Sequence, residues 1–322
     1  MVMQKNKKYD IVGIGNAIVD LIAEVDDSYL EKNSINKGSM SLVDYDVANR
    51  IGNEVDIVKT ISGGSVANSI VCIAQQNLKT VFIGKVNQDE LGEKFAKGLA
   101  EENVEFKITK SLANKHTARC IILVSTDAER TMNTYLGVSQ ELTEEDVDLN
   151  IIEESSILYL EGYLWDLDNA KKAIKKSIST AINSETKIAF SISDAFCVDR
   201  FREEFIDLVN NSADIIFANE SEIKSLFETN ELNDAIKKCQ DTKKIFAVTL
   251  GDKGAKIIYK NEVVDIKAEV INKLVDTTGA GDLFAAGFLA EYLKTQDLEL
   301  SGKQGVKMAS IIIQQFGARL EF

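Results

Sequence analysis

The feature that most constrains this chain is a repeated succession of a short apolar run and an amphipathic helical segment. In the second half, the runs at 155–163, 187–193 and 214–220 are each followed by a helical pattern, and a fourth run at 244–251 leads into a hairpin pattern. Units of this kind build parallel sheets that are covered by helices. The sequence therefore predicts an α/β fold with a helix-covered sheet.

Two β-rich pieces interrupt this succession. Residues 117–125 and 129–137 alternate like two antiparallel strands joined by a polar turn, and a second β-rich piece lies near 20–45. We predict that both belong to a small inserted β-sheet that forms a lid. The predicted boundaries are 1–17, 48–112 and 140–322 for the main domain, and 18–47 and 113–139 for the lid.

Composition excludes several classes of function. The chain has 37 basic and 51 acidic residues and a net charge of −14, which disfavours nucleic acid as a partner. Its one histidine, His116, cannot build a multi-histidine metal site, and with no other histidine a His-based triad is nearly ruled out. Four cysteines without C-x-x-C spacing, together with the lack of a long apolar run or a secretory segment, predict a cytoplasmic protein without a membrane span.

The strongest local signal is the heptapeptide DTTGAGD at 276–282, which runs directly into an apolar helical segment. Gly279, Ala280 and Gly281 can turn successive backbone amides into one concavity at a helix N-terminus, where the amides and the helix dipole stabilise an anion. Asp282, in the first turn, could accept a proton from an attacking hydroxyl beside that concavity. The alternative is an ordinary glycine-rich turn. It explains the four residues GAGD equally well, but it explains the full heptapeptide less well than an anion-binding turn does. No GxxxxGK[ST] loop is present.

Five stretches together resemble one family. DTTGAGDLFAAGF at 276–288 resembles the C-terminal signature of the ribokinase-like (PfkB) carbohydrate kinases, and GGSVANS at 63–69 resembles their N-terminal substrate motif. GNAIVD at 15–20, ANESE at 218–222 and TLGDKG at 249–254 match further family motifs in the same order. The stretches GNAIVD, ERTMNTYLG at 129–137, YLEGYLW at 159–165 and SISDAFCVDRF at 191–201 match the adenosine kinases better than the sugar-specific members. Within the family the chain therefore looks most like the adenosine kinases.

The resemblance implies a three-layer α/β/α sandwich with a β-sheet lid, ATP and Mg²⁺ as cosubstrate and metal, and transfer to the 5′-hydroxyl of a ribonucleoside such as adenosine in purine salvage. It implies a catalytic set of Asp282, Gly279, Ala280, Gly281 and the lid residue Arg130. The acceptor would be bound by Asn16, Ile18, Asp20, Met40, Gly64, Ser65, Asn68, Met132, Thr134, Tyr163 and Phe196. The nucleotide would be bound by Asn219, Glu222, Thr249, Gly251, Gly254 and Thr278. Mg²⁺ would be held, through water, by Asn219 and Glu222.

Several alternatives stay open from the residues alone. Asn68 and the Asn219–Glu222 pair could be helix caps, residues 251–254 a tight turn, and the apolar members of the acceptor set ordinary core. A sugar kinase of the ribokinase, fructokinase or ketodeoxygluconate kinase type is the main rival, and a non-catalytic nucleoside-binding regulatory protein is a second. A monovalent cation such as K⁺ near Gly317 is a further candidate, and the chain is predicted to be a monomer or a lid-mediated homodimer.

Overall fold

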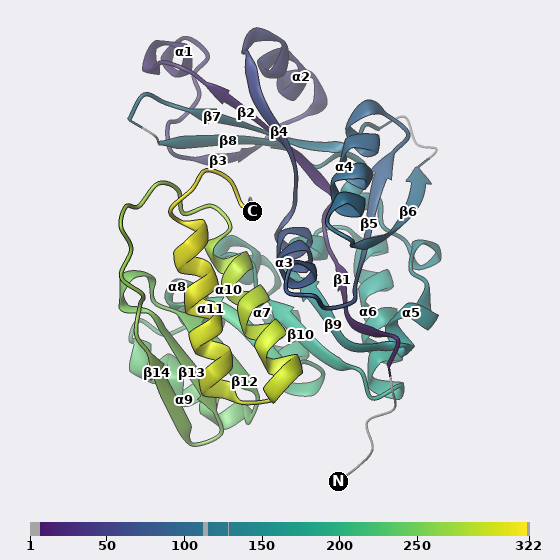
Figure 1. Ribbon diagram of the computed structural model, residues 1–322, viewed down its shortest axis with the longest axis vertical. Helices are drawn as coiled ribbons and strands as arrows, with labels where there is room; N and C mark the ends of the chain where they lie inside the picture. The colour runs from purple at the N-terminus through teal and green to yellow at the C-terminus, as the bar shows by residue number, and fades with distance from the viewer. Residues whose placement is uncertain (1–6, 112–114, 128, 321–322) are drawn as a thin grey trace.

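The computed structural model describes residues 7–111, 115–127 and 129–320 and arranges them as a large layered body with a smaller sheet beside it (Figure 1). A nine-stranded sheet runs through the large body, with its seven strands from β6 to β12 all parallel to their neighbours and the hairpin β13–β14 antiparallel at one edge. In spatial order the strands are β6 Glu105–Ser111, β5 Thr80–Asn87, β1 Tyr9–Ile14, β9 Ser155–Glu161, β10 Lys187–Ser191, β11 Ile215–Asn219, β12 Ile245–Thr249, β13 Ala255–Tyr259 and β14 Glu262–Ile266.

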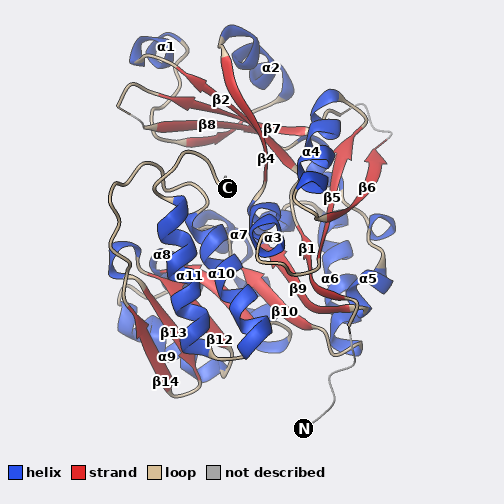
Figure 2. Cartoon of the chain, in the orientation of Figure 1, coloured by secondary structure: helices blue, strands red, loops and turns tan. Residues whose placement is uncertain are grey.

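Successive side chains of each strand enter opposite cores, because the side-chain period of a strand is two residues. In β9, Ile157 and Tyr159 join one hydrophobic cluster, whereas Leu158 and Leu160 join the other. The first face is covered by α3 Ser65–Ala74, α4 Glu90–Glu101, α10 Ala280–Thr295 and α11 Leu298–Ile312. The second is covered by α5 Leu149–Glu153, α6 Asp168–Asn183, α7 Ala195–Asn211, α8 Glu220–Leu226 and α9 Leu232–Thr242. The predicted three-layer sandwich is confirmed (Figure 2).

The smaller sheet has five strands and forms the lid (Figure 1). Its order is β3 Met40–Leu42, β8 Arg130–Tyr135, β7 Ala118–Val124, β2 Ile18–Glu24 and β4 Ile57–Gly63. Helices α1 Asp27–Lys32 and α2 Tyr45–Glu54 cover the face that is turned away from the large body, where Leu30 and Ile51 pack on Ile121. The opposite face carries a second apolar cluster that includes Ile22 and Ile122.

The lid extends further along the chain than the sequence predicts. Residues 48–63 were assigned to the main domain, but α2 packs on the lid and β4 pairs antiparallel with β2, from Gly63 opposite Ile18 to Ile57 opposite Ala23. That part of the predicted boundary is wrong. The physical reason is the burial pattern of β4, whose first five residues are all half-buried or exposed. Such a strand suits the edge of a small sheet, whereas a strand of a parallel sheet covered on both faces would be buried throughout.

An aspartate caps the start of each of two long helices, α7 and α11. Asp194 accepts a hydrogen bond from the Cys197 amide and starts α7 before a kink at Phe201, and Asp297 accepts one from the Leu300 amide and starts α11. Short 3₁₀ turns lie at Gly137–Glu141, Glu144–Asp146, Gly162–Trp165 and Gly251–Lys253.

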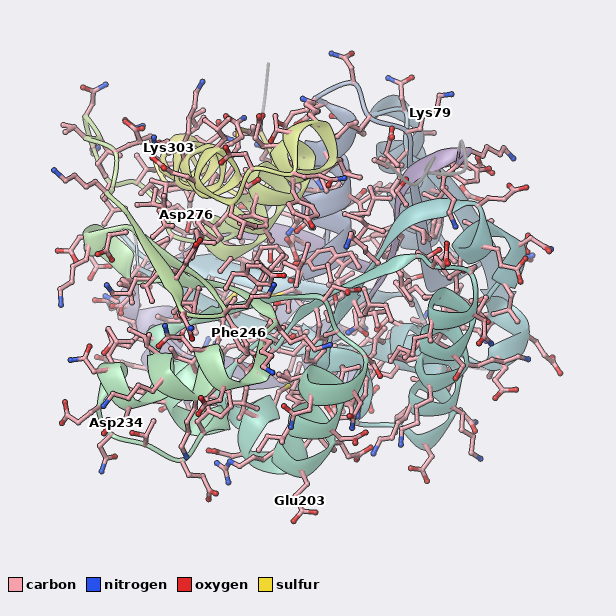
Figure 3. The ribbon with its side chains drawn as sticks, turned by 90° about the horizontal axis from the view of Figure 1, so that it is seen from below. Lys79, Glu203, Asp234, Phe246, Asp276 and Lys303 are labelled. Atoms are coloured by element: carbon pink, nitrogen blue, oxygen red, sulfur yellow. The ribbon has the colours of Figure 1, made fainter. Side chains whose placement is uncertain are left out.

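A view from below shows the layers with their side chains (Figure 3). Charged side chains such as Lys79, Glu203 and Lys303 point outward, whereas Phe246 and the acidic Asp276 are buried. No helix in the described part of the chain has both the length and the apolar character that crossing a membrane requires.

Candidate active site

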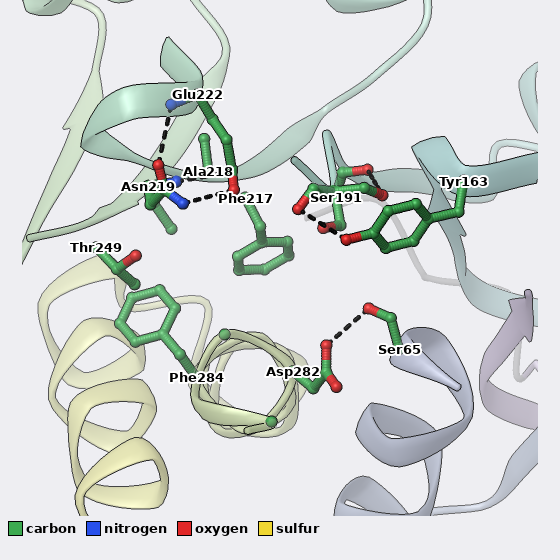
Figure 4. Close-up of a pocket in the computed structure, with 14 residues that line it drawn as sticks. Ser65, Tyr163, Ser191, Phe217, Ala218, Asn219, Glu222, Thr249, Asp282 and Phe284 are labelled. Atoms are coloured by element: carbon green, nitrogen blue, oxygen red, sulfur yellow. Dashed lines mark hydrogen bonds between the residues drawn. The ribbon is translucent and has the colours of Figure 1, made fainter. Parts of the chain in front are cut away.

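A cavity of about 280 Å³ opens where several parallel strands end at their carboxyl edge (Figure 4). Open α/β sheets commonly place their ligand sites at this edge. The ends of β10, β11 and β12 and the start of α10 surround the cavity. Its lining residues are Ser65, Tyr163, Ser191, Ser193, Phe217, Ala218, Asn219, Glu222, Ala247, Thr249, Gly279, Gly281, Asp282 and Phe284.

The N-terminus of α10 faces this cavity. Gly279 is the N-cap with φ +78°, and a Cβ there would lie 2.7 Å from the Ala318 Cβ, so both conformation and space require glycine. Within the described residues, the Gly279 and Gly281 amides have no hydrogen-bond acceptor, whereas the Ala280 amide donates to the Thr277 carbonyl. The predicted three-amide cradle thus offers two free amides at the positive end of a helix dipole.

Asp282 lies in the first turn of α10, and residues of α3 hold both of its carboxylate oxygens. Ser65 Oγ donates to Oδ1 at 2.7 Å (Figure 4), and Asn68 Nδ2 donates to Oδ2 at 3.0 Å. Burial raises the pKa of Asp282, and these two hydrogen bonds oppose the rise because they favour the charged carboxylate. The carboxylate is therefore partly buried and held in a preorganised position beside free helix-terminal amides at the cavity.

Asn219 and Glu222 form a reciprocal cap at the start of α8. The Asn219 side chain accepts from the Glu222 amide, while Glu222 Oε2 accepts from the Asn219 amide and Oε1 from Asn219 Nδ2. Burial raises the pKa of Glu222 to about 7. The alternative that this pair caps a helix is therefore confirmed. Both residues also line the cavity, where a ligand could contact them as well.

The donor set fits Mg²⁺ only through water and a phosphate. No group of three His, Cys, Asp or Glu side chains suited to a metal ion occurs within the residues that the structure describes. Both Glu222 oxygens already accept hydrogen bonds. Mg²⁺ keeps several waters and is commonly bound by one or two carboxylates together with substrate phosphates, which this arrangement allows.

Arg130 reaches from the lid to the start of the anion-binding turn. Its Nη2 lies 2.7 Å from Asp276 Oδ2, and both side chains are buried, with 9% and 3% exposure. Asp276 also accepts hydrogen bonds from the Thr278 and Gly317 amides. The sequence motif includes Asp276 without indicating a role for it, whereas in the structure its carboxylate connects the lid, the turn and the C-terminal segment.

Polar residues at the junction of lid and main sheet surround the backbone of Gly64. That glycine has φ +99°, and a Cβ would overlap the Asn16 carbonyl oxygen. Glu161, at the end of β9, fixes the same junction by accepting hydrogen bonds from Asn16 N, Asn16 Nδ2 and the Val66 amide. Glu161 was not predicted from the sequence, although an acid directly after the apolar run Ile157–Leu160 was the available signal.

The predicted apolar residues are only partly brought together. Ile18 and Met132 pack on the lid face opposite α1 and α2, Met40 at the lid edge is 47% exposed, and Tyr163 lines the cavity. Phe196 is 77% exposed and is not among the lining residues, so its contact with an acceptor stays a prediction.

Two other predicted positions have structural explanations. Thr134 is buried, and its hydroxyl donates to the Cys120 sulfur within the lid sheet. Gly254 has φ +91° in the turn after β12, where a Cβ would overlap the Ile266 carbonyl, and Gly251 has φ +62° in the same turn. Thr249, just before that turn, lines the cavity, whereas the two glycines do not. Their contact with a nucleotide stays a prediction.

The carboxyl group of Asp20 gives a test of the site's electrostatics. Burial raises its pKa to about 7, and no donor within the described residues reaches it. Ionisation above pH 7 therefore costs folded-state stability, and the cost disappears as the pH falls toward 4, where the carboxyl is protonated in both states. We expect Asp20→Asn to stabilise the ligand-free protein at pH 8 by on the order of 2 kcal/mol, a gain that fades toward pH 4, in urea unfolding.

Asp127 serves as a control, because the pKa of its exposed carboxyl is shifted in the opposite direction. Its hydrogen bond with Lys37 lowers that pKa to about 2. Its stabilising contribution is present at pH 8 and is lost in acid, so Asp127→Asn should not gain stability at pH 8. An Asp20→Asn protein whose stability follows the wild type at every pH would show that Asp20 is solvated.

Comparisons with known proteins agree with this geometry. The model of the pfkB family carbohydrate kinases matches residues 10–321. Adenosine kinase from Sinorhizobium meliloti is 41% identical, with a TM-score of 0.89 and coverage of 97% of this chain and 96% of that one. A Rhizobium etli protein named "probable sugar kinase" is 39% identical, with a TM-score of 0.90 and coverage of 97% and 95%. Adenosine kinase from Saccharomyces cerevisiae is 26% identical, with coverage of 95% of each. This chain belongs to the pfkB family of carbohydrate kinases and is a phosphotransferase that acts on an alcohol group.

Proposed function

We propose that the chain transfers the terminal phosphoryl group of ATP to the 5′-hydroxyl of a ribonucleoside, and that adenosine is the preferred acceptor. The observation that carries this proposal is the Asp282 carboxylate, held by Ser65 and Asn68 next to the free amides of Gly279 and Gly281. A proton acceptor and an anion site within one helical turn are what an alcohol-to-phosphate transfer needs. A non-catalytic binding protein would have no need of that pairing.

In this mechanism the carboxylate of Asp282 orients the acceptor hydroxyl and takes its proton as the oxygen attacks the γ-phosphorus, while the bond from that phosphorus to the bridging oxygen breaks and ADP leaves. The Gly279 and Gly281 amides then stabilise the charge on the equatorial oxygens of the migrating phosphoryl group. An ordinary Asp is a weak base, so its contribution comes from placement and from the exclusion of water. Mg²⁺, positioned through water by Asn219 and Glu222, would neutralise charge on the phosphates.

The acceptor side favours a nucleoside over a free sugar. The face of the lid opposite α1 and α2 carries Ile18, Ile61 and Met132 in one apolar cluster, which suits a purine ring better than a second set of hydroxyls. Asp20, with two free acceptor oxygens, suits a vicinal diol of ribose. The similarity to the Sinorhizobium meliloti adenosine kinase supports the same choice.

The similarity to a protein named as a sugar kinase keeps a second candidate, a sugar kinase of the same family. A coupled assay of ADP release with adenosine, inosine, guanosine, ribose and fructose separates the two. We expect kcat/KM for adenosine to exceed the values for the free sugars by at least about a hundredfold, since burial of a purine contributes roughly 3 kcal/mol or more. Preference for ribose or fructose would refute the nucleoside assignment.

As to assembly, we favour a monomer. Helices α1 and α2 already cover the outer face of the lid sheet, so a homodimer formed through that face would have to displace them.

Gly281 tests the anion site without disturbing the fold. A Cβ added there meets no protein atom within 4 Å and points into open space beside the cavity. We expect Gly281→Ala to keep or slightly raise the melting temperature, because alanine is the better helix former by roughly 1 kcal/mol. The methyl group should nevertheless lower kcat by about tenfold or more, because it would crowd the phosphoryl oxygens.

The matched control is Gly52→Ala in α2, another helical glycine with no atom within 4 Å of an added Cβ. It should show the same small gain in melting temperature with unchanged kcat. Equal kcat in both variants would mean that phosphate does not approach Gly281.

A further inference from the structure

The C-terminal segment brings an arginine to the support of the proposed base. Arg319 Nε lies 3.3 Å from Asn68 Oδ1, and Asn68 Nδ2 lies 3.0 Å from Asp282 Oδ2. The two contacts connect the segment after α11, helix α3 and helix α10 in one hydrogen-bonded chain. Sequence reasoning assigned Arg319 no role.

The chemistry of the guanidinium decides which way the Asn68 amide points. Arginine carries five N–H donors and no acceptor, so only the carbonyl oxygen of Asn68 can face Arg319 favourably. The amide nitrogen must then face Asp282, where it donates a hydrogen bond to the carboxylate. Without Arg319 the amide could turn over and present its oxygen to Asp282, which would repel the ionised form.

Among the described residues the guanidinium of Arg319 makes no ion pair, and its Nη2 is a buried donor without an acceptor. Burial lowers the pKa of Arg319 to about 10, against the charges of Asp20 and Glu102. A partly buried cation that meets no counter-ion among the described residues is costly, so its contact with Asn68 is the feature that needs explanation.

We propose that Arg319 is a positioning residue of the phosphoryl transfer, which acts through Asn68 to keep an amide donor on the carboxylate of Asp282. The inference rests on the proposed role of Asp282 as the base, and it holds for any acceptor alcohol. Arg319 does not touch the reacting atoms in this account.

The test below includes the pH dependence of kcat, which the charged groups near Asp282 also influence. Besides Ser65 and Asn68, Asp282 interacts electrostatically with the carboxyls of Asp20 and Glu161. It also interacts with the hydroxyls of Tyr159 and Tyr163. The charge of Arg319 also favours ionised Asp20, so its loss would affect acceptor binding as well. Measuring kcat at saturating acceptor separates the base from the binding site.

The experiment is a double-mutant cycle between Arg319→Met and Asn68→Ala, with kcat measured from pH 6 to pH 9. We expect Arg319→Met alone to lower kcat at pH 7.5 by about tenfold and to move its acid limb to higher pH. In the Asn68→Ala background the same replacement should change kcat by less than about twofold, because the link is already absent. Arg319→Lys, which keeps the charge, serves in the same cycle should the Met variant fold poorly.

The control is Gln75→Ala, which removes a donor to the Leu320 carbonyl and so loosens the same segment without touching Asn68. It should leave kcat within about twofold of the wild type. Equal kcat losses from Arg319→Met in both backgrounds would overturn the positioning role. That outcome differs from failure of the proposed base, which would appear as full turnover in Asp282→Asn.

Discussion

Asp282→Asn should lower kcat by roughly 10²–10⁴-fold while nucleotide affinity changes only a few-fold. The substitution keeps the size of the side chain and removes the proton acceptor. It should not unfold the protein, because burial already disfavours the charged carboxylate that is removed. Steady-state ADP release gives kcat, and calorimetric titration with ATP gives affinity.

Asp252→Asn is the matched control, since Asp252 is an exposed carboxylate in the turn after β12. It should have wild-type kcat. Near-wild-type turnover in Asp282→Asn would show that the proton goes elsewhere and would remove the basis of the mechanism.

Arg130→Met should destabilise the protein by roughly 3–5 kcal/mol, because it leaves the carboxylate of Asp276 buried without its cation. Turnover should fall as well, since the same change frees the lid from the turn that carries Thr278 and Gly279. Urea unfolding reports the stability, and kcat measured well below the transition reports the function.

Arg130→Lys is the informative partner, because it keeps a positive charge near Asp276 but loses the planar donor set. It should lie between the Met variant and the wild type in stability. A Met variant as stable as the wild type would indicate that the ion pair between lid and turn does not form in solution.

The sequence predicted the layered fold well because local signals and global topology agree there. Apolar runs such as 187–193, each followed by a helical pattern, have few alternative arrangements, and the parallel order of β9, β10 and β11 follows from them. The lid boundary could not be predicted in the same way. Strand β4 is a half-exposed edge strand, and its partner β2 is distant enough in the chain that no local pattern identifies it.

Local geometry was predictable where one motif carries it and not where distant segments meet. DTTGAGD predicts a helix that begins at its glycines, and α10 does begin there, with Asp282 and Asn219 in the lining of one cavity. The catalytic role of these residues stays a prediction. Glu161 and Arg319 could not be predicted, because each contacts a residue more than a hundred positions away in the chain. Glu161 contacts Asn16, and Arg319 contacts Asn68. Side chains that support a site from another element leave no spacing pattern in the sequence.

The proposed mechanism requires an acceptor hydroxyl and a terminal phosphate to meet between Asp282 and the amides of Gly279 and Gly281. The decisive measurement is a crystal structure with adenosine and a non-hydrolysable ATP analogue. We predict the 5′-oxygen within about 3 Å of an Asp282 carboxylate oxygen and the γ-phosphate against the Gly281 amide. A nucleoside bound with its 5′-oxygen turned away from Asp282, or a γ-phosphate remote from the start of α10, would contradict the account.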